Sequence, residues 1–263
     1  MNEPLLTLHD VRLSFGGVNA LDGVSFDVGR GEIVGLIGPN GAGKTTLFDC
    51  ISGFRTPRAG RIEFVGARGP VDLGELPAHA RVGLGIGRTF QNARLFRSVS
   101  VRDILRTVQH DAMRSGFVRS VLGVRSARDE EREVARRADE ALALVGLGAH
   151  ADKQAQELST GMLRLCELAA VVTVRPKLLL LDEPSSGIAQ KETEALLPLL
   201  RRLRDHLDAT VLVIEHDMPL VMALADRIVA MASGAVIADG TPDAVRADAK
   251  VLESYLGSRA GAA

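Results

Sequence analysis

Apolar residues recur along this chain in two patterns, one typical of strands and one typical of helices. Short apolar or alternating runs predict strands over residues 5–15, 20–28, 32–37, 61–65, 82–90, 177–183 and 210–214, and a hairpin over 227–238 that turns at Gly234. Residues 178–181 are four consecutive leucines, a pattern typical of a parallel strand buried on both faces. The strands before residue 66 that flank 32–37 favour a small antiparallel layer beside a mainly parallel core.

Helical periodicity predicts helices over 45–51, 163–174, 190–206 and 218–225, and two more, one opened by Ser100 as its N-cap and one that begins at Ser126. The helix from Ser126 runs to Val145 and stops at Gly146, and its many charges indicate a solvated face. Pro198 predicts a kink or a split within 190–206, and the last five residues, 259–263, are expected to fray. The helices between residues 92 and 175 therefore form an insert that interrupts an α/β core.

Composition and charge narrow the class of protein. The chain has 263 residues and a formal net charge of -1, which gives no electrostatic reason to expect nucleic acid as a partner. Cys50 and Cys166 lie in apolar helical patterns far apart in sequence, so we expect two reduced core residues in a cytosolic protein. No apolar run is long enough to span a membrane, and no secretory signal is expected at the N-terminus. If the protein acts at a membrane, a partner must supply the spanning helices.

The segment 38–46, Gly-Pro-Asn-Gly-Ala-Gly-Lys-Thr-Thr, fits the pattern G-x-x-x-x-G-K-[ST] and lies between a predicted strand and a predicted helix. Glycines let the backbone N–H groups wrap around phosphate oxygens at a helix N-terminus. Lys44 can then contact the β- and γ-phosphates, and the Thr45 hydroxyl can ligate Mg²⁺. A glycine-rich turn with a surface lysine is the alternative, and the strand and helix around the loop argue against it. The candidate nucleotide-binding residues are Gly38, Asn40, Gly41, Gly43, Lys44, Thr45 and Thr46.

Two acids follow the leucine strand directly. Asp182, at the carboxyl end of a buried strand, is placed to hold Mg²⁺, and Glu183 is placed to orient and polarise an attacking water. A solvated strand end is the alternative reading of two acids in this position. That alternative weakens because the phosphate loop itself needs a metal ion.

The chain carries further elements in an order that resembles the ABC ATPases. Residues 158–162, Leu-Ser-Thr-Gly-Met, resemble the signature motif L-S-G-G-Q of that family, and Gln91 matches its Q-loop glutamine. Residues 184–189 occupy the position of the D-loop, and His216 matches the switch histidine. Phe15 matches the aromatic residue that stacks on adenine, although its position alone suits a core phenylalanine equally well.

This resemblance covers essentially the whole chain and implies one ABC ATPase domain over 1–263. The fold would be α/β, with a P-loop NTPase core around a parallel sheet, a small antiparallel β subdomain, and a helical subdomain inserted over 92–175. The resemblance also implies a head-to-tail dimer with ATP and Mg²⁺ between two such domains. Ser159 and Gly161 would then bind the γ-phosphate held by the partner. His216 would hydrogen-bond the γ-phosphate, and Gln91 would sense the metal ion and the water.

Within the family, the regions 36–48, 85–91 and 94–96 are most similar to the ATPases of branched-chain amino-acid importers. That similarity implies transmembrane permease subunits, a second ABC ATPase subunit (homo- or heterodimer), and indirectly a periplasmic or extracellular solute-binding protein. It also implies a peripheral location on the cytoplasmic face of the cell membrane. The ATPase of a lipid or lipopolysaccharide exporter and a soluble ABC protein without a transport role remain alternatives.

Three residues depart from the family pattern. Thr160 replaces the first signature glycine, as is common in this group, and Met162 replaces the glutamine. Ala189 stands where the D-loop usually has aspartate or asparagine, so a polar contact across the dimer is lost. Because Ser159 and Gly161 are retained, hydrolysis is still expected, with altered coupling across the dimer.

Overall fold

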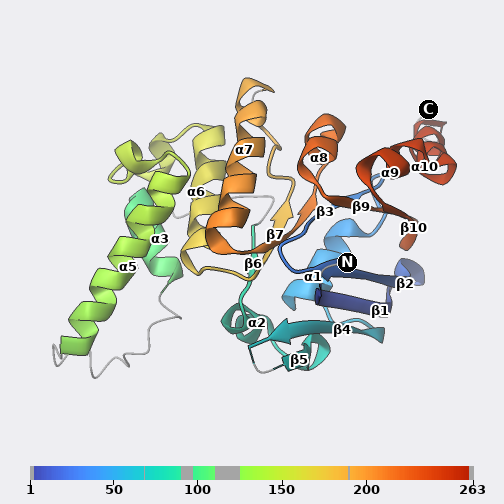
Figure 1. The fold of residues 1–263 in the computed structure, drawn as a ribbon, viewed down its shortest axis with the longest axis horizontal. Helices are drawn as coiled ribbons and strands as arrows, with labels where there is room; N and C mark the ends of the chain where they lie inside the picture. Colours follow the sequence, from blue (N-terminus) through green and yellow to red (C-terminus); the bar gives the residue numbers. More distant parts are fainter. Residues whose placement is uncertain (1–2, 68, 90–96, 110–124, 189, 261–263) are drawn as a thin grey trace.

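The computed structural model describes residues 3–67, 69–89, 97–109, 125–188 and 190–260, and it contains two sheets (Figure 1). The larger sheet has six strands in the order β10-β9-β3-β8-β7-β6. All neighbouring pairs in it are parallel except β9 and β10, which form an antiparallel hairpin. Its strands are β3 Ile33–Ile37, β6 Ile86–Arg88, β7 Leu178–Asp182, β8 Thr210–Ile214, β9 Arg227–Ala232 and β10 Ala235–Gly240.

The smaller sheet has four antiparallel strands in the order β2-β1-β4-β5. Its strands are β1 Pro4–Phe15, β2 Val18–Gly29, β4 Ala59–Gly66 and β5 Gly69–Asp72. The strands predicted over 5–15, 20–28 and 61–65 are confirmed as an antiparallel layer, and β5 completes it. This layer lies beside the larger sheet, near α1 (Figure 1).

Central strands β3, β7 and β8 are buried along their whole length, and their side chains alternate between two hydrophobic cores. In β7, Leu179 and Leu181 belong to a core shared with the helices on one face of the sheet. Leu178 and Leu180 belong to a second core, shared with α1 and the antiparallel layer. The run of four leucines is thus explained by burial on both faces, as the sequence predicts.

The helices lie between the strands along the chain and after the last of them. On the second-core side lies α1 Lys44–Ser52, and α2 Ala78–Leu84 follows the 3₁₀ turn η1 Leu73–Glu75. Between β6 and β7 the chain forms α3 Val101–Val108, α5 Arg125–Leu144, η3 Gly148–His150, η4 Ala155–Glu157 and α6 Thr160–Thr173. The remaining helices are α7 Gln190–Leu207, α8 Met218–Leu224, α9 Pro242–Ala247 and α10 Ala249–Ala260. The described part of 92–175 is therefore helical, and its bounds as a subdomain stay a prediction.

Several sequence-based boundaries are wrong, each for a local reason. The strand predicted over 82–90 is in fact the end of α2 followed by a strand of three residues, because Gly85, at φ +99°, caps the helix with left-handed backbone. Pro198 neither splits nor ends α7, and its exposed position lets water satisfy the carbonyl that loses its donor. The helix predicted from Ser126 to Val145 is present as α5, one residue earlier at each end, over Arg125–Leu144.

The C-terminal end of the chain also differs from the prediction. Arg259 and Ala260 belong to α10, so the predicted fraying does not include them, and 261–263 lie outside the described residues. By contrast, Ser100 is confirmed as the N-cap of α3, since its hydroxyl oxygen accepts a hydrogen bond from the backbone N–H of Asp103. Cys50 and Cys166 are confirmed as free, buried thiols.

Candidate functional site

The phosphate-loop sequence forms the turn between β3 and α1, and sterics require glycine at two of its positions, Gly38 and Gly43. Gly38 has φ +148°, and a Cβ atom there would lie 2.1 Å from the carbonyl oxygen of Met231. Gly43 has φ +102°, and its Cβ would lie 2.4 Å from the carbonyl oxygen of Ala20. The loop backbone thus packs so closely against the backbone of β9 and β2 that no side chain would fit at these two positions.

Lys44 begins α1 and is 6% exposed. Its Nζ donates to the carbonyl oxygens of Gly38, at 2.6 Å, and Pro39, at 3.0 Å, so the ammonium folds back over its own loop. Burial lowers the pKa of Lys44, and the nearby carboxylates of Glu183 and Asp182 oppose that shift. The lysine therefore sits as a buried cation within the field of both candidate acids.

The other loop residues leave the N-terminus of α1 open. Asn40, Gly41 and Thr45 are exposed, and Thr46 is half-buried in the first turn. The unpaired N–H groups of a helix start favour an anion.

Asp182, the last residue of β7, is a buried carboxylate with an incomplete set of partners. It is 2% exposed, and its Oδ2 accepts from the Arg88 guanidinium at 3.2 Å. Its Oδ1 is buried and has no hydrogen-bond partner. Burial raises the pKa of Asp182, and Arg88 counters part of that shift. A buried oxygen without a donor is a position that a cation can occupy.

Sequence reasoning missed the role of Arg88 at the end of β6. Its guanidinium also donates to Asp49 Oδ1 at 2.7 Å and to Ser52 Oγ at 2.9 Å, both on α1. One buried arginine therefore joins β6, the helix that follows the phosphate loop, and Asp182. The only signal in the sequence is a cation within an otherwise apolar, glycine-spaced segment.

Glu183 and His216 lie together because β7 and β8 are parallel neighbours in which Asp182 is opposite Ile214. The backbone N–H of Glu183 donates to the carbonyl of Ile214 at 2.9 Å. Glu183 has φ +50°, a conformation that costs a non-glycine residue energy and that concentrates at functional sites. His216 Nε2 lies 3.0 Å from Glu183 Oε1. The two candidate catalytic side chains are thus within ion-pair distance of each other.

The candidate signature residues lie elsewhere in the fold. Ser159 is the N-cap of α6, where its Oγ accepts from the backbone N–H of Met162 at 3.3 Å, and both Ser159 and Thr160 are exposed. Gly161 is in the first turn of α6. Since α6 packs in the core on the opposite face of the large sheet from α1, these residues do not share one face with the phosphate loop.

Of three further residues singled out in the sequence, the structure describes Phe15 but not Gln91 or Ala189. Phe15, at the end of β1, is 43% exposed rather than a core residue, and the Arg55 guanidinium lies 5.1 Å from its ring centroid. Its ring face is therefore accessible to flat, cationic or aromatic groups.

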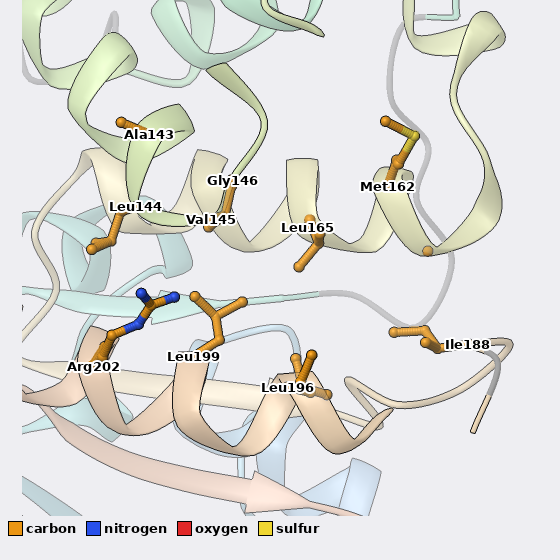
Figure 2. Close-up of a pocket in the computed structure, with 12 residues that line it drawn as sticks. Ala143, Leu144, Val145, Gly146, Met162, Leu165, Ile188, Leu196, Leu199 and Arg202 are labelled. Atoms are coloured by element: carbon orange, nitrogen blue, oxygen red, sulfur yellow. The ribbon is translucent and has the colours of Figure 1, made fainter. Parts of the chain in front are cut away.

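A pocket of about 360 Å³ separates the end of α5 and the start of α6 from α7 (Figure 2). Figure 2 shows Leu165 of α6 and Leu199 of α7 on its two sides, with Met162 and Ile188 toward one end and Arg202 toward the other. The helical insert and the core therefore do not pack tightly here, close to the signature segment.

The chain is similar to known proteins along nearly its whole length. Residues 21–186 match the model of the family described as ABC transporter, and residues 235–261 match one described as branched-chain amino acid ATP-binding cassette transporter. It is 40% identical over 257 residues to the high-affinity branched-chain amino acid transport ATP-binding protein LivG of Escherichia coli, covering 98% of this chain and 99% of that one. It is 39% identical to BraF of Pseudomonas aeruginosa, of the same description, with the same coverage.

Solved structures agree with the sequence relatives. A crystal structure of the ADP conformation of an ATP-binding cassette of an ABC transporter superimposes with a TM-score of 0.82 at 29% identity, covering 97% of this chain and 100% of that one. A nucleotide-free cassette superimposes with a TM-score of 0.80 at 28% identity, covering 96% and 99%. This chain therefore belongs to the ABC transporter family and is one of its nucleotide-binding, ATP-hydrolysing cassettes.

Proposed function

We propose that this chain is the motor subunit of an importer for branched-chain or related amino acids, in which ATP-driven closure of a cassette dimer drives separate membrane permeases. The substrate class is supported by relatives such as LivG and BraF, and by the C-terminal match over 235–261. The chemistry is supported above all by one observation: Glu183 and His216 are in contact beside the phosphate loop and Asp182.

In this proposal the N-terminus of α1 binds the triphosphate. Backbone N–H groups from Asn40 to Thr46 surround the phosphate oxygens, and Asn40 and Gly41 form the exposed rim of the loop. Lys44 exchanges its two carbonyl partners for the β- and γ-phosphates. Phe15, whose ring is exposed, stacks on the adenine.

Asp182 and the Thr45 hydroxyl are the residues that would hold Mg²⁺, with Gln91 as a further candidate. The unpartnered, buried Oδ1 of Asp182 fits this role, because oxygen ligands are what Mg²⁺ prefers. When bound, the ion would offset negative charge on the β- and γ-phosphates.

Glu183 is the group that would accept a proton from the attacking water, and His216 would donate a hydrogen bond to the γ-phosphate. The 3.0 Å contact between them lets His216 also fix the orientation of the Glu183 carboxylate. The left-handed backbone at Glu183 turns its side chain out of the strand direction, where an ordinary β residue would continue.

The second half of the phosphate site would come from another cassette. Within one chain, Ser159 and Gly161 lie on a helix that packs on the opposite face of the sheet from α1. Their exposed helix N-terminus would bind the γ-phosphate held by a partner, which can be a second copy of this chain or a related cassette.

Transmission to the membrane would use the helical insert. The pocket between α5, α6 and α7 leaves that insert room to shift relative to the core. No helix in the described residues is long and apolar enough to cross a membrane. Because relatives such as LivG are described as transport ATP-binding proteins, our proposal gives the chain a peripheral place on the cytoplasmic face of the membrane, bound to transmembrane permeases that receive solute from a periplasmic or extracellular binding protein.

Replacing Glu183 by glutamine tests the chemistry. We expect Glu183→Gln to lower ATP turnover by about 10²-fold or more, because a general base is removed. The variant is expected to bind ATP as the parent does and to accumulate as a dimer in size-exclusion chromatography with ATP and Mg²⁺. An exposed acid far from the site, Asp243→Asn in α9, serves as the control. Unchanged turnover in Glu183→Gln would exclude Glu183 as the base.

A second experiment tests the transport role. The chain is purified with its co-purifying permeases, reconstituted in liposomes, and supplied with the associated binding protein and radiolabelled leucine. ATP-dependent uptake of leucine that Glu183→Gln abolishes is expected. ATP hydrolysis without uptake of any branched-chain amino acid would overturn the substrate assignment and leave the ATPase chemistry intact.

A further inference from the structure

Glu215 is a buried carboxylate whose hydrogen bonds all go to the backbone of two loops at the candidate site. It is 2% exposed and follows β8 directly. Its Oε1 accepts from the N–H of Ser185 at 2.9 Å. Its Oε2 accepts from the N–H of His216 at 2.8 Å and from the N–H of Asp217 at 3.2 Å. One side chain thus satisfies three backbone donors.

The three donors belong to functionally different segments. Ser185 lies two residues after Glu183, in the turn that leads to α7. His216 carries the imidazole that contacts Glu183, and Asp217 is the N-cap of α8, where its side chain accepts from the N–H of Leu220 at 2.9 Å. Glu215 therefore fixes the turn after Glu183 and the start of the His216 loop relative to each other.

Glu215 has no ion-pair partner in the described residues, so its charge is stabilised by these N–H dipoles. A carboxylate that accepts several backbone N–H bonds forms charge-assisted bonds, which are about twice as strong as neutral ones. Glutamine at this position has one acceptor oxygen and one NH₂ group. Whichever way its amide is oriented, a donor faces Ser185 or faces the pair His216 and Asp217, so at least one of the three bonds is lost.

We propose that Glu215 is a positioning residue for ATP hydrolysis: its carboxylate ties the turn after Glu183 to the His216 loop, and so holds the base and the histidine in contact. The proposal rests on the roles proposed above for Glu183 and His216. It also links two chain segments that would face a partner cassette and a γ-phosphate, so both would respond together when either one is contacted.

The proposal predicts a specific kinetic pattern for Glu215→Gln in the assembled, ATP-hydrolysing complex. Misplacement of a catalytic pair by about 1 Å costs about 10²-fold, so kcat is expected to fall by about 30- to 100-fold. The KM for ATP is expected to stay within about threefold, because the hydrogen bonds of Glu215 given by the described residues go to Ser185, His216 and Asp217 and not to the phosphate loop that binds the triphosphate. Glu32→Gln is the control: Glu32 is a half-buried carboxylate that accepts the Gly29 N–H at 2.8 Å, pairs with Arg227 at 2.9 Å, and lies outside the site.

A double-mutant cycle separates positioning from a loss of folding. If Glu215 acts through His216, Glu215→Gln added to His216→Ala lowers kcat by less than about threefold further. All variants are assayed at a temperature at which circular dichroism shows them folded, and Glu215→Asp replaces Glu215→Gln if the latter does not fold. Full additivity of the two changes would overturn the proposal, as would a rise in KM equal to the fall in kcat. Loss of turnover in Glu183→Gln but not in Glu215→Gln would refute the positioning role alone, whereas unchanged turnover in Glu183→Gln would refute the underlying function.

Discussion

Asp182→Asn is expected to leave the nucleotide-free protein about as stable as the parent while removing its stabilisation by Mg²⁺ and ATP. The substitution breaks the 3.2 Å ion pair with Arg88, and breaking a buried pair typically costs about 3–5 kcal/mol when the other charge is left alone. Here Arg88 keeps Asp49 at 2.7 Å. The variant also avoids the several kcal/mol that burial of a carboxylate with an unpartnered oxygen costs.

These opposing effects give a net change in the free energy of unfolding within about 1 kcal/mol, which is about 2–4 °C in melting temperature for a chain of this size. With ligand at about 100 times its dissociation constant, the parent gains about 2.7 kcal/mol of stability. If losing a metal ligand weakens binding by about 100-fold, the variant gains only about 0.4 kcal/mol at the same concentration. The difference between these two ligand-induced gains in stability corresponds to several degrees in melting temperature.

Differential scanning fluorimetry measures both quantities, with ATP plus Mg²⁺ and with ATP plus EDTA. Parent and variant are expected to differ only with Mg²⁺, because the loop binds the triphosphate without Asp182. Asp49→Asn removes the other carboxylate of the same arginine and is expected to keep the Mg²⁺ response. An apo variant destabilised by more than about 3 kcal/mol would refute the balance worked out above. An undiminished Mg²⁺ response would refute the metal role.

The same variant tests the sign of a pH effect. Because burial raises the pKa of Asp182 above its ordinary 3.8, the folded chain binds this proton more tightly than the unfolded chain does. The contribution of this group to stability is therefore largest below about pH 3.8 and is lost as the pH rises through the raised pKa. Glu167 and Asp239 also have pKa values raised by burial and remain in the variant, so the decline due to Asp182 should show in the difference between the unfolding free energies of parent and Asp182→Asn, measured by urea unfolding across this window.

Two more substitutions and one labelling experiment test other parts of the structure. Gly38→Ala places a Cβ 2.1 Å from the Met231 carbonyl oxygen and is expected to abolish ATP binding. The Cβ of Gly41→Ala meets no atom within 4 Å, so this variant is expected to lose only the roughly 1–2 kcal/mol that a left-handed backbone costs. Equal losses of the two variants in thermal unfolding and in ATP titration would contradict this expectation. Burial raises the pKa of Cys50 to about 11 and that of Cys166 to about 12, so neither thiol is expected to react with Ellman's reagent at pH 8 until the chain is unfolded in guanidinium, when two thiols per chain are expected. Rapid labelling of the folded protein would contradict the buried positions of both thiols.

The sequence predicted the parts of the site that depend on local pattern and strand order. Parallel neighbours end at the same edge of a sheet, so the acids predicted at the end of 177–183 and the histidine predicted after 210–214 lie at one edge, where Glu183 and His216 are 3.0 Å apart. The predicted antiparallel layer and hairpin are confirmed as well, because alternation and glycine turns are local signals.

What could not be predicted depends on contacts between distant residues or on backbone conformation. Arg88 and Asp182 are 94 residues apart, and Ser185 and Glu215 are 30 apart, so no spacing rule joins them. The misassigned strand over 82–90 reflects a helix ended by the left-handed Gly85, which leaves Val82 49% exposed on α2 although its sequence context is apolar.

Arg88 has a mechanical consequence. It is the last residue of β6, and the chain runs from there through 89–97 into the helical insert. Its guanidinium donates hydrogen bonds to Asp182 and to Asp49 and Ser52 of α1. A displacement of the end of β6 is thus expected to be transmitted to the buried aspartate and to α1 through one rigid, planar group. Lysine in place of Arg88 would keep the charge but lose the planar guanidinium, and with it this rigid link between β6, Asp182 and α1.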